Sequence, residues 1–216
     1  MGGAIAGNRI GLARDKRQLE EKRRSLDDML DRLKAEGNQK KIKTISTNEE
    51  HRETLFKAMD RANDKLIILS GWVTSYVVDK DFQNKLALCL QRGTDVYIGY
   101  GYQYEPRPKK DHETEAVANL KDLSEWCDLQ DTKGHFVYRE YPNHAKLLIC
   151  DEMFAVTGSF NWLSNAGRSL NEERSWIVYD KQFISAELDI VVDGLMSPLK
   201  STKQDVLKKI FPWSDR

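Results

Sequence analysis

Residues 144–161 read HAKLLICDEMFAVTGSFN. Two short apolar runs lie in this stretch, at 147–150 and 153–156, and only the acidic pair 151–152 separates them. Short apolar runs that meet at a polar pair predict two strands joined by a tight turn. Because such a hairpin reverses the chain, the residues before its first strand and after its second strand are expected to meet at one edge of a sheet.

Four polar side chains flank this predicted hairpin. His144 and Lys146 are two residues apart at its start, and Ser159 and Asn161 are two residues apart at its end. Side chains two residues apart on a strand point to the same face. The hairpin therefore predicts a cluster of an imidazole, an ammonium, a hydroxyl and an amide.

This combination of groups suits a phosphate. An imidazole acts as a nucleophile or as a general acid and base near neutral pH, and a lysine supplies positive charge. The hydroxyl and the amide add neutral donors for the charge that develops on a tetrahedral phosphorus, and Gly158 allows the backbone to come close. With one histidine in the group and Asp151 expected to face the protein, we predict neither a metal site nor a cofactor.

The chain around the hairpin alternates between strand and helix patterns. Further strands are expected at 66–69, 96–98, 136–138 and 176–179. Helices are expected from Thr47 to Ala62, around 82–89 up to Gly93, and over 116–127, 184–195 and 202–211. This alternation predicts an α/β sandwich with helices on both faces of a mixed, largely parallel sheet.

Residues 1–44 are expected to form a separate N-terminal part, ahead of a catalytic domain at 45–216. Leucines recur every seven residues at 12, 19, 26 and 33, so 9–36 is predicted to be one long helix that ends at Gly37. It is either a solvated helix with one apolar edge or a helix that dimerises or links domains. Residues 38–44 are interpreted as a basic linker.

Composition limits the class of protein. The 216 residues are neutral overall, but residues 1–44 carry 12 Lys and Arg against 7 Asp and Glu, which leaves an excess of five acidic residues in 45–216. Nucleic-acid contacts must therefore come from a local basic site or from the N-terminal arm. No apolar run is long enough for a membrane span, no secretory signal is evident, and three widely spaced cysteines predict reduced, buried thiols. A cytoplasmic protein is expected.

The spacing of the hairpin residues resembles the HKD signature of the phospholipase D superfamily. That signature is His-x-Lys, four residues, Asp, six residues, then Gly-Ser-x-Asn, and every gap matches here at His144, Lys146, Asp151 and 158–161. The resemblance covers roughly residues 45–197. It implies a phospholipase D-like sandwich, a metal-independent phosphodiesterase, and a catalytic set that includes Asp151.

The resemblance also implies a supporting glutamate eleven residues after the motif asparagine. That position is Glu172, which would accept a hydrogen bond from the second ring nitrogen of His144. Glu173 is the alternative. Otherwise the two form a solvated acidic pair before a strand.

The mechanism that the resemblance implies needs two histidines. One His144 attacks phosphorus to form a phosphohistidine, and a second protonates the leaving oxygen and then activates water. The other histidines begin no His-x-Lys motif, and His51 on a solvent-facing helix, His112 in a loop and His135 at a strand start are expected to be structural or surface residues. The second His144 is therefore expected from a homodimer partner, with the N-terminal helix as a possible aid.

The substrate is the open question. Short chains with one motif in this superfamily are often nucleases, so a DNA or RNA nuclease is the first hypothesis. A phospholipid phosphodiesterase is the second, and a non-catalytic nucleic-acid-binding module is the third. The loop 102–112 mixes tyrosines with basic residues, which suits phosphates and stacked bases, although it can equally be a solvated loop. Candidate substrate contacts are Trp72 (or a core tryptophan), Arg107, Lys109, Lys110 and Arg168.

Partners and setting rest on the overall organisation of the chain. An effector-like domain joined to a helical segment is used in bacterial defence systems, which makes antiphage defence or repair a hypothesis. The near-neutral charge allows a regulatory or targeting protein to deliver the nucleic acid.

Overall fold

The computed structural model describes residues 22, 24–28, 42–101, 108–141, 143–167 and 172–196. Residues 22 and 24–28 are helical. The rest of the predicted N-terminal helix lies outside the described residues, as does the predicted helix over 202–211. The unit that begins at Ile42 contains all the described strands and the four helices between residues 48 and 196.

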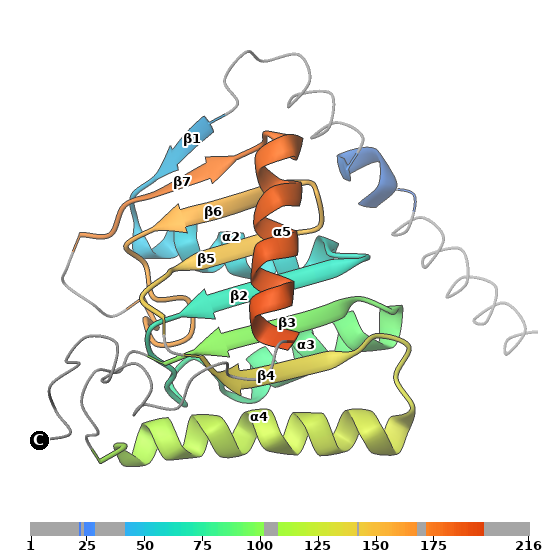
Figure 1. The fold of residues 1–216 in the computed structure, drawn as a ribbon, viewed down its shortest axis with the longest axis vertical. Helices are drawn as coiled ribbons and strands as arrows, with labels where there is room; N and C mark the ends of the chain where they lie inside the picture. Colours follow the sequence, from blue (N-terminus) through green and yellow to red (C-terminus); the bar gives the residue numbers. More distant parts are fainter. Residues whose placement is uncertain are drawn as a thin grey trace, which may run out of the picture. The chain divides into compact units, whose positions relative to one another are not determined.

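A seven-stranded sheet forms the centre of this unit (Figure 1). Its spatial order is β1-β7-β6-β5-β2-β3-β4. The strands are β1 Ile42–Ile45, β2 Lys65–Ser70, β3 Asp95–Tyr100, β4 Phe136–Glu140, β5 Leu147–Cys150, β6 Phe154–Gly158 and β7 Ser175–Val178. β5 and β6 are the predicted hairpin, and they pair antiparallel from Leu147 opposite Thr157 to Cys150 opposite Phe154.

Strand directions explain why the sheet is mixed yet mostly aligned. β2, β3 and β4 are parallel neighbours, whereas β5 and β7 run against the strands beside them. Five of the seven strands therefore point the same way, and the α/β sandwich with a mixed, largely parallel sheet is confirmed. The helical connections after β2 and β3 give the parallel pairs, as expected of βαβ units.

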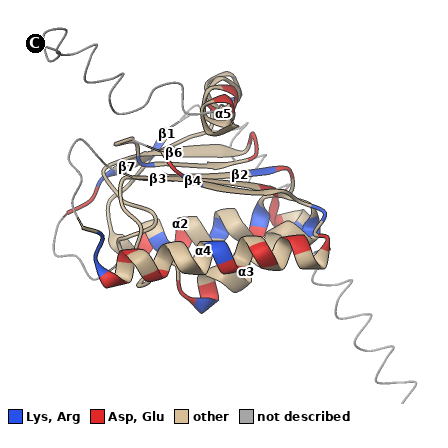
Figure 2. Ribbon diagram, turned by 60° about the horizontal axis from the view of Figure 1, so that its bottom comes forward, with Lys and Arg blue, Asp and Glu red and all other residues tan. Residues whose placement is uncertain are grey.

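Helices cover both faces of the sheet (Figure 2). They are α2 Asn48–Arg61, α3 Lys80–Arg92, α4 Asp111–Gln130 and α5 Lys181–Met196. Of the helices that the structure describes in this unit, α2, α3 and α4 lie on one face and α5 lies on the other. Two separate apolar clusters reflect this arrangement, because alternate residues along each central strand face opposite layers.

The helix ends follow their local sequence. Thr47 caps α2 by accepting from the Glu50 amide, while the Glu50 carboxylate accepts from the Thr47 amide. Asp79 caps α3 in the same way, with its carboxylate accepting from the Phe82 amide. Gly93 ends α3 in the left-handed region at φ 99°, where a side chain would be strained.

One part of the predicted linker belongs to the sheet. Ile42–Ile45 form β1, which pairs antiparallel with β7 along its whole length. The prediction of a linker up to residue 44 is therefore corrected at its end. Three of the four β1 residues are exposed, since an edge strand buries little, so no apolar alternation marked it in the sequence.

The three cysteines are buried thiols outside any disulfide, as predicted. Burial raises the pKa of the Cys89 thiol to about 11, which keeps it protonated and unreactive. Within the described ranges, no helix is long and apolar enough to cross a membrane.

Candidate active site

The hairpin brings the motif residues to the carboxyl edge of β2. Leu147, the first residue of β5, lies opposite Leu69 near the end of β2, and Gly158, the last residue of β6, lies opposite Ser175. His144 and Lys146 enter the sheet where Ser159 leaves it. The predicted meeting of the two ends of the hairpin at one sheet edge is thus the arrangement found.

His144 and Lys146 differ in exposure. His144 is exposed, whereas the Lys146 side chain is buried at 8% exposure and its ammonium donates to the His144 carbonyl oxygen at 2.8 Å. Burial lowers the pKa of Lys146, and the carboxylate of Glu173 partly offsets this effect. The imidazole is accessible to a substrate, while the lysine holds the backbone beneath it.

Ser159 is held by the strand that follows the motif. Its hydroxyl donates to the Glu173 carboxylate and accepts from the Arg174 amide at 3.0 Å. The Ser159 amide donates to the Arg174 carbonyl at 3.0 Å. This short ladder extends the pairing of β6 with β7, so Ser159 orients Glu173.

Glu173, and not Glu172, joins the motif. Glu172 is exposed, and its carboxylate lies 3.9 Å from the Arg174 guanidinium. Residues on a strand alternate in direction. Counting back from buried Ser175 therefore places Glu173 on the same side as Ser175 and turns Glu172 away. The structure therefore places Glu173, the alternative position, beside Ser159 and places Glu172 beside Arg174, and the role of supporting His144 stays a prediction.

Asn161 connects the motif to the end of β2. Its side-chain oxygen accepts from the Gly71 amide at 3.2 Å, which leaves its amide nitrogen as a donor group. Trp72 follows directly, partly buried, and its carbonyl accepts from the Ser70 hydroxyl at 2.8 Å. Trp72 is therefore beside the motif along the backbone.

Gly158 is required by the close approach of β6 and β7. A Cβ at this position would lie 2.3 Å from the Arg174 carbonyl oxygen and 2.3 Å from the Ser175 hydroxyl. Both contacts are far inside van der Waals distance, and the first involves backbone. A substitution at Gly158 would therefore push apart the strands that hold Ser159 and Glu173.

His51 is a feature of the site region that the sequence interpretation missed. It was predicted to face solvent, but it is fully buried, so that prediction is wrong. Its Nδ1 donates to the Thr47 carbonyl at 2.6 Å, which assigns Nε2 of the neutral ring as the acceptor of the Ser175 hydroxyl at 2.8 Å. The ring stacks on Phe160, which stands between the motif residues Ser159 and Asn161 in the sequence. The two ring centroids are 4.3 Å apart. The signal was present, because residues 51, 55 and 59 share one helical face.

The electrostatics of this region centre on Glu173. Burial lowers the pKa of His51, and the Glu173 carboxylate acts in the opposite direction on it, as it does on Lys146. One carboxylate thus influences two basic groups and receives the Ser159 hydroxyl. In the described part of the chain, no group of three potential ligands is placed to hold a metal ion.

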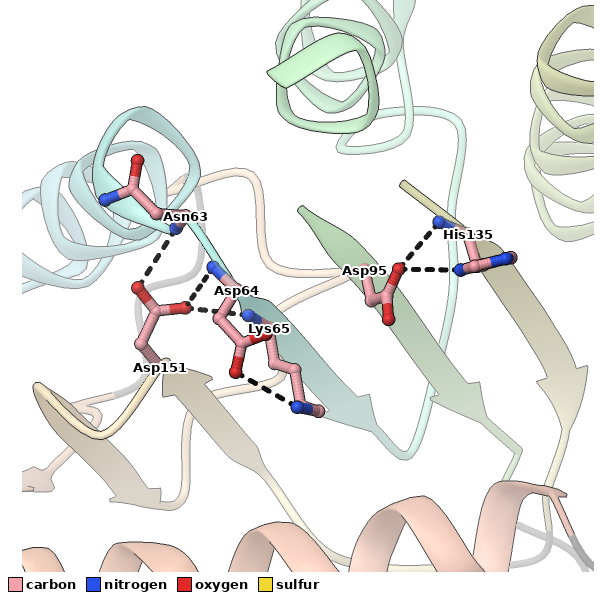
Figure 3. Close-up of polar contacts among 6 residues, drawn as sticks. All are labelled: Asn63, Asp64, Lys65, Asp95, His135 and Asp151. Carbon is pink, nitrogen blue, oxygen red and sulfur yellow. Dashed lines mark hydrogen bonds and ion pairs between the residues drawn. The ribbon is translucent and has the colours of Figure 1, made fainter. Parts of the chain in front are cut away.

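Asp151 lies at the other end of β5 (Figure 3). Its carboxylate accepts from the backbone amides of Asn63, Asp64 and Lys65 at 3.0, 2.9 and 2.7 Å. It therefore ties the β5–β6 turn to the start of β2. Asp151 faces the protein as expected, and its place in the catalytic set is corrected, because the length of β5 separates it from His144.

The other histidines have local partners. His135 donates from its backbone amide to Asp95, and its ring nitrogen lies 2.9 Å from the same carboxylate, again at the end of the sheet away from His144 (Figure 3). His112 is the second residue of α4 rather than a loop residue, and its ring stacks on Tyr76.

Of the four basic residues predicted to contact the substrate, the structure describes two. The Lys109 ammonium pairs with Glu140 at 2.8 Å, and the Lys110 amide donates to Glu113 at the start of α4. Both precede α4 at the edge of the sheet where β4 ends. Arg107 and Arg168 lie outside the described residues, so their predicted roles stay predictions.

Comparison with known proteins identifies the family. Residues 55–190 match the family model described as cardiolipin synthase, PLD-like domain, which is more than half of the chain. The chain belongs to the phospholipase D superfamily. This membership supports phosphodiester hydrolysis as its general activity.

Solved structures agree with this fold. Nuc, a phospholipase D family member from Salmonella typhimurium, is 19% identical with a TM-score of 0.50, and the match covers 70% of this chain and 93% of Nuc. NucT from Helicobacter pylori is 19% identical with a TM-score of 0.52, covering 72% of this chain and 96% of NucT. Phosphatidylserine synthase from Haemophilus influenzae is 18% identical with a TM-score of 0.50, covering 79% of this chain and 45% of that protein. Among curated proteins, no significant match was found.

Proposed function

We propose that this phospholipase D superfamily member is a metal-independent nuclease that acts on DNA or RNA through His144. The observation that carries the proposal is the gathering of His144, Lys146, Ser159 and Asn161 at one sheet edge, with Glu173 held beside them. Nuc and NucT, whose folds this chain shares over nearly their whole lengths, favour the nuclease form.

The chemistry proceeds by two displacements at phosphorus. His144 of one chain attacks, a nitrogen–phosphorus bond forms, and the bond to the leaving oxygen breaks as the partner's His144 gives that oxygen a proton. The partner's His144 then takes a proton from water, which attacks phosphorus and releases His144. Lys146 and the Asn161 amide stabilise the charge on the non-bridging oxygens.

Glu173 supports this chemistry from the side. Through its carboxylate it favours the charged form of Lys146, and Ser159 fixes its position. A carboxylate that orients a reacting imidazole sets which ring nitrogen carries the proton. We assign this role to Glu173 in place of Glu172.

The first test is cleavage in excess EDTA. Wild type and His144→Ala are compared on plasmid, single-stranded DNA and RNA. We expect cleavage by wild type that resists EDTA and is absent in the variant. Cleavage that EDTA abolishes, or that His144→Ala retains, would refute the proposal.

A phospholipid phosphodiesterase is the second candidate, because the matching family model carries the name of a lipid enzyme. Vesicles of anionic phospholipid form a parallel arm of the same experiment. Release of a headgroup without cleavage of any nucleic acid would favour this candidate over the nuclease.

The shared site predicts a specific result when chains are mixed. If each site needs two His144 side chains, a mixed dimer of wild type and His144→Ala is inactive. After subunit exchange at constant total protein, activity should then fall with the square of the wild-type fraction. A linear fall would show that one chain is sufficient and would refute the shared homodimer site.

A further inference from the structure

The segment between β2 and α3 presents one exposed aromatic side chain from a tightly held backbone. Tyr76 is 62% exposed, while Thr74 before it is 8% exposed and both Val77 and Val78 after it are fully buried. The amides of Val77 and Val78 donate to the Thr74 carbonyl at 3.1 and 2.9 Å. The turn is thus anchored on both sides, and it holds the exposed ring of Tyr76 in a defined place.

His112 supports the Tyr76 ring. The two rings are stacked with centroids 5.2 Å apart and planes 29° apart. The contact is reinforced by the backbone, because the Ser75 amide donates to the His112 carbonyl at 2.8 Å, and the Ser75 hydroxyl donates to Glu115 at 2.6 Å. One face of the tyrosine is thereby covered, and the remaining exposed ring surface faces solvent.

Hydrogen bonds connect the backbone segment that carries Tyr76 to the end of the motif at the proposed reaction site. Gly71 binds Asn161 of the motif, and the Thr74 amide donates to the Leu163 carbonyl at 2.9 Å. Tyr76 follows Gly71 by five positions, so the ring is anchored at most about 18 Å from the Asn161 contact even if the chain were fully extended. A substrate bound at the motif can reach it within a few nucleotides.

The surroundings favour stacking over attraction of phosphates. Lys109 is paired with Glu140, and the first turn of α4 carries Asp111 and Glu113 beside Lys110 (Figure 2). Counting Glu115 beside Ser75, this surface carries two lysines against four carboxylates, so it does not attract a backbone phosphate. An aromatic ring with an open face, by contrast, accepts any base by stacking.

We propose that Tyr76, supported by His112, is a stacking site for an unpaired base of the nucleic acid whose phosphodiester reacts at His144. The inference rests on the proposed nuclease function and adds a substrate class to it, namely single-stranded or locally unpaired nucleic acid. A paired base has its faces already stacked within the duplex, so duplex binds here only where a base is displaced.

The test measures binding to the full-length chain with His144→Ala, so that the probe is not cut. The probes are a fluorescein-labelled oligothymidylate and an abasic oligonucleotide of the same length. Tyr76→Ala should raise the Kd for the oligothymidylate about 5- to 150-fold, as expected for a lost stacked base, and leave the Kd for the abasic probe unchanged. Tyr76→Phe keeps the ring and should bind within about 2-fold.

Leu129→Ala is the matched control. Leu129 is 82% exposed near the opposite end of α4, so its loss removes an apolar side chain even more exposed than Tyr76 and far from the first turn of that helix. An unchanged Kd in Tyr76→Ala would overturn the proposal. So would an equal loss on the abasic probe, an equal loss in Leu129→Ala, or an effect seen only on vesicles of anionic phospholipid.

The outcomes separate this inference from the proposed function. EDTA-resistant cleavage by wild type with no effect of Tyr76→Ala on binding refutes the stacking site alone. Failure of the wild type to bind or cleave any nucleic acid refutes both.

Discussion

The two ends of the β5–β6 hairpin carry parts of one sequence motif but differ in what their side chains do. At the turn, the Asp151 carboxylate accepts hydrogen bonds from three backbone amides. At the open end, His144 is exposed above a buried Lys146. Seven residues of extended chain span about 23 Å, so the two ends cannot act on one phosphate. The comparison teaches that one residue of the motif belongs to the scaffold.

The largest expected effect is at the open end. Lys146→Met should lower the rate of phosphodiester cleavage about 100- to 1,000-fold, because it removes a preorganised charge next to the reacting phosphate. Its stability should change little or rise, since a buried ammonium is costly. Cleavage rates and denaturant unfolding of the same preparations provide the measurement. A variant that keeps wild-type activity would contradict the role of Lys146.

At the turn, the expected effect is on stability. Asp151→Ala should lower the free energy of unfolding by about 2–3 kcal/mol, because three amides lose a charged acceptor. Cleavage per folded molecule should change little. Urea unfolding checks this, with Glu152→Ala as the control, whose exposed side chain should matter by less than about 0.5 kcal/mol. Loss of catalysis in fully folded Asp151→Ala would return Asp151 to the catalytic set.

The neighbouring glutamates allow a sharper comparison within the open end. Glu173→Gln should reduce kcat about 10- to 100-fold, as for other residues that orient a reacting group. Glu172→Gln should remain within about 2-fold, because its carboxylate faces solvent next to Arg174. Steady-state kinetics of the two variants decide which glutamate supports catalysis. A larger loss of kcat in Glu172→Gln than in Glu173→Gln would restore Glu172, the position implied by its spacing from Asn161.

The smallest expected effect is a pH dependence of stability from His51. Burial lowers its pKa in the folded state, so the unfolded chain binds the proton more readily. The stabilisation is fully present above the unfolded pKa of about 6.5 and is lost as pH falls towards the folded pKa. Unfolding of wild type and His51→Gln, compared at neutral and mildly acidic pH, should show a difference that shrinks on acidification. A difference that grows would contradict this.

The hairpin was predictable because the spacing of its apolar and polar residues encodes it. A spacing of two positions places side chains on a shared face of a strand, and the length of β5 sets the gap from Lys146 to Asp151. The helices α2 to α5 were predictable from their apolar periodicity and from caps such as Thr47 and Gly93.

What could not be predicted depends on contacts distant in sequence. β1 was missed because an edge strand of four mostly exposed residues carries no alternation, and it is defined only by its pairing with β7. The choice between Glu172 and Glu173 depends on the register of β7 against β6, which a fixed count from Asn161 does not contain. The burial of His51 could have been predicted from the helical face it shares with Leu55 and Met59, but its hydrogen-bond partner Ser175, 124 residues away, could not.

The central claim is that His144 attacks phosphorus, and the stereochemistry of cleavage tests it most directly. A nucleic acid with a single phosphorothioate of known configuration is cleaved in isotopically labelled water with EDTA present. Each in-line displacement inverts phosphorus. Two displacements through a phosphohistidine predict overall retention, with no product from His144→Ala. Overall inversion would mean that water attacks directly and would contradict the account.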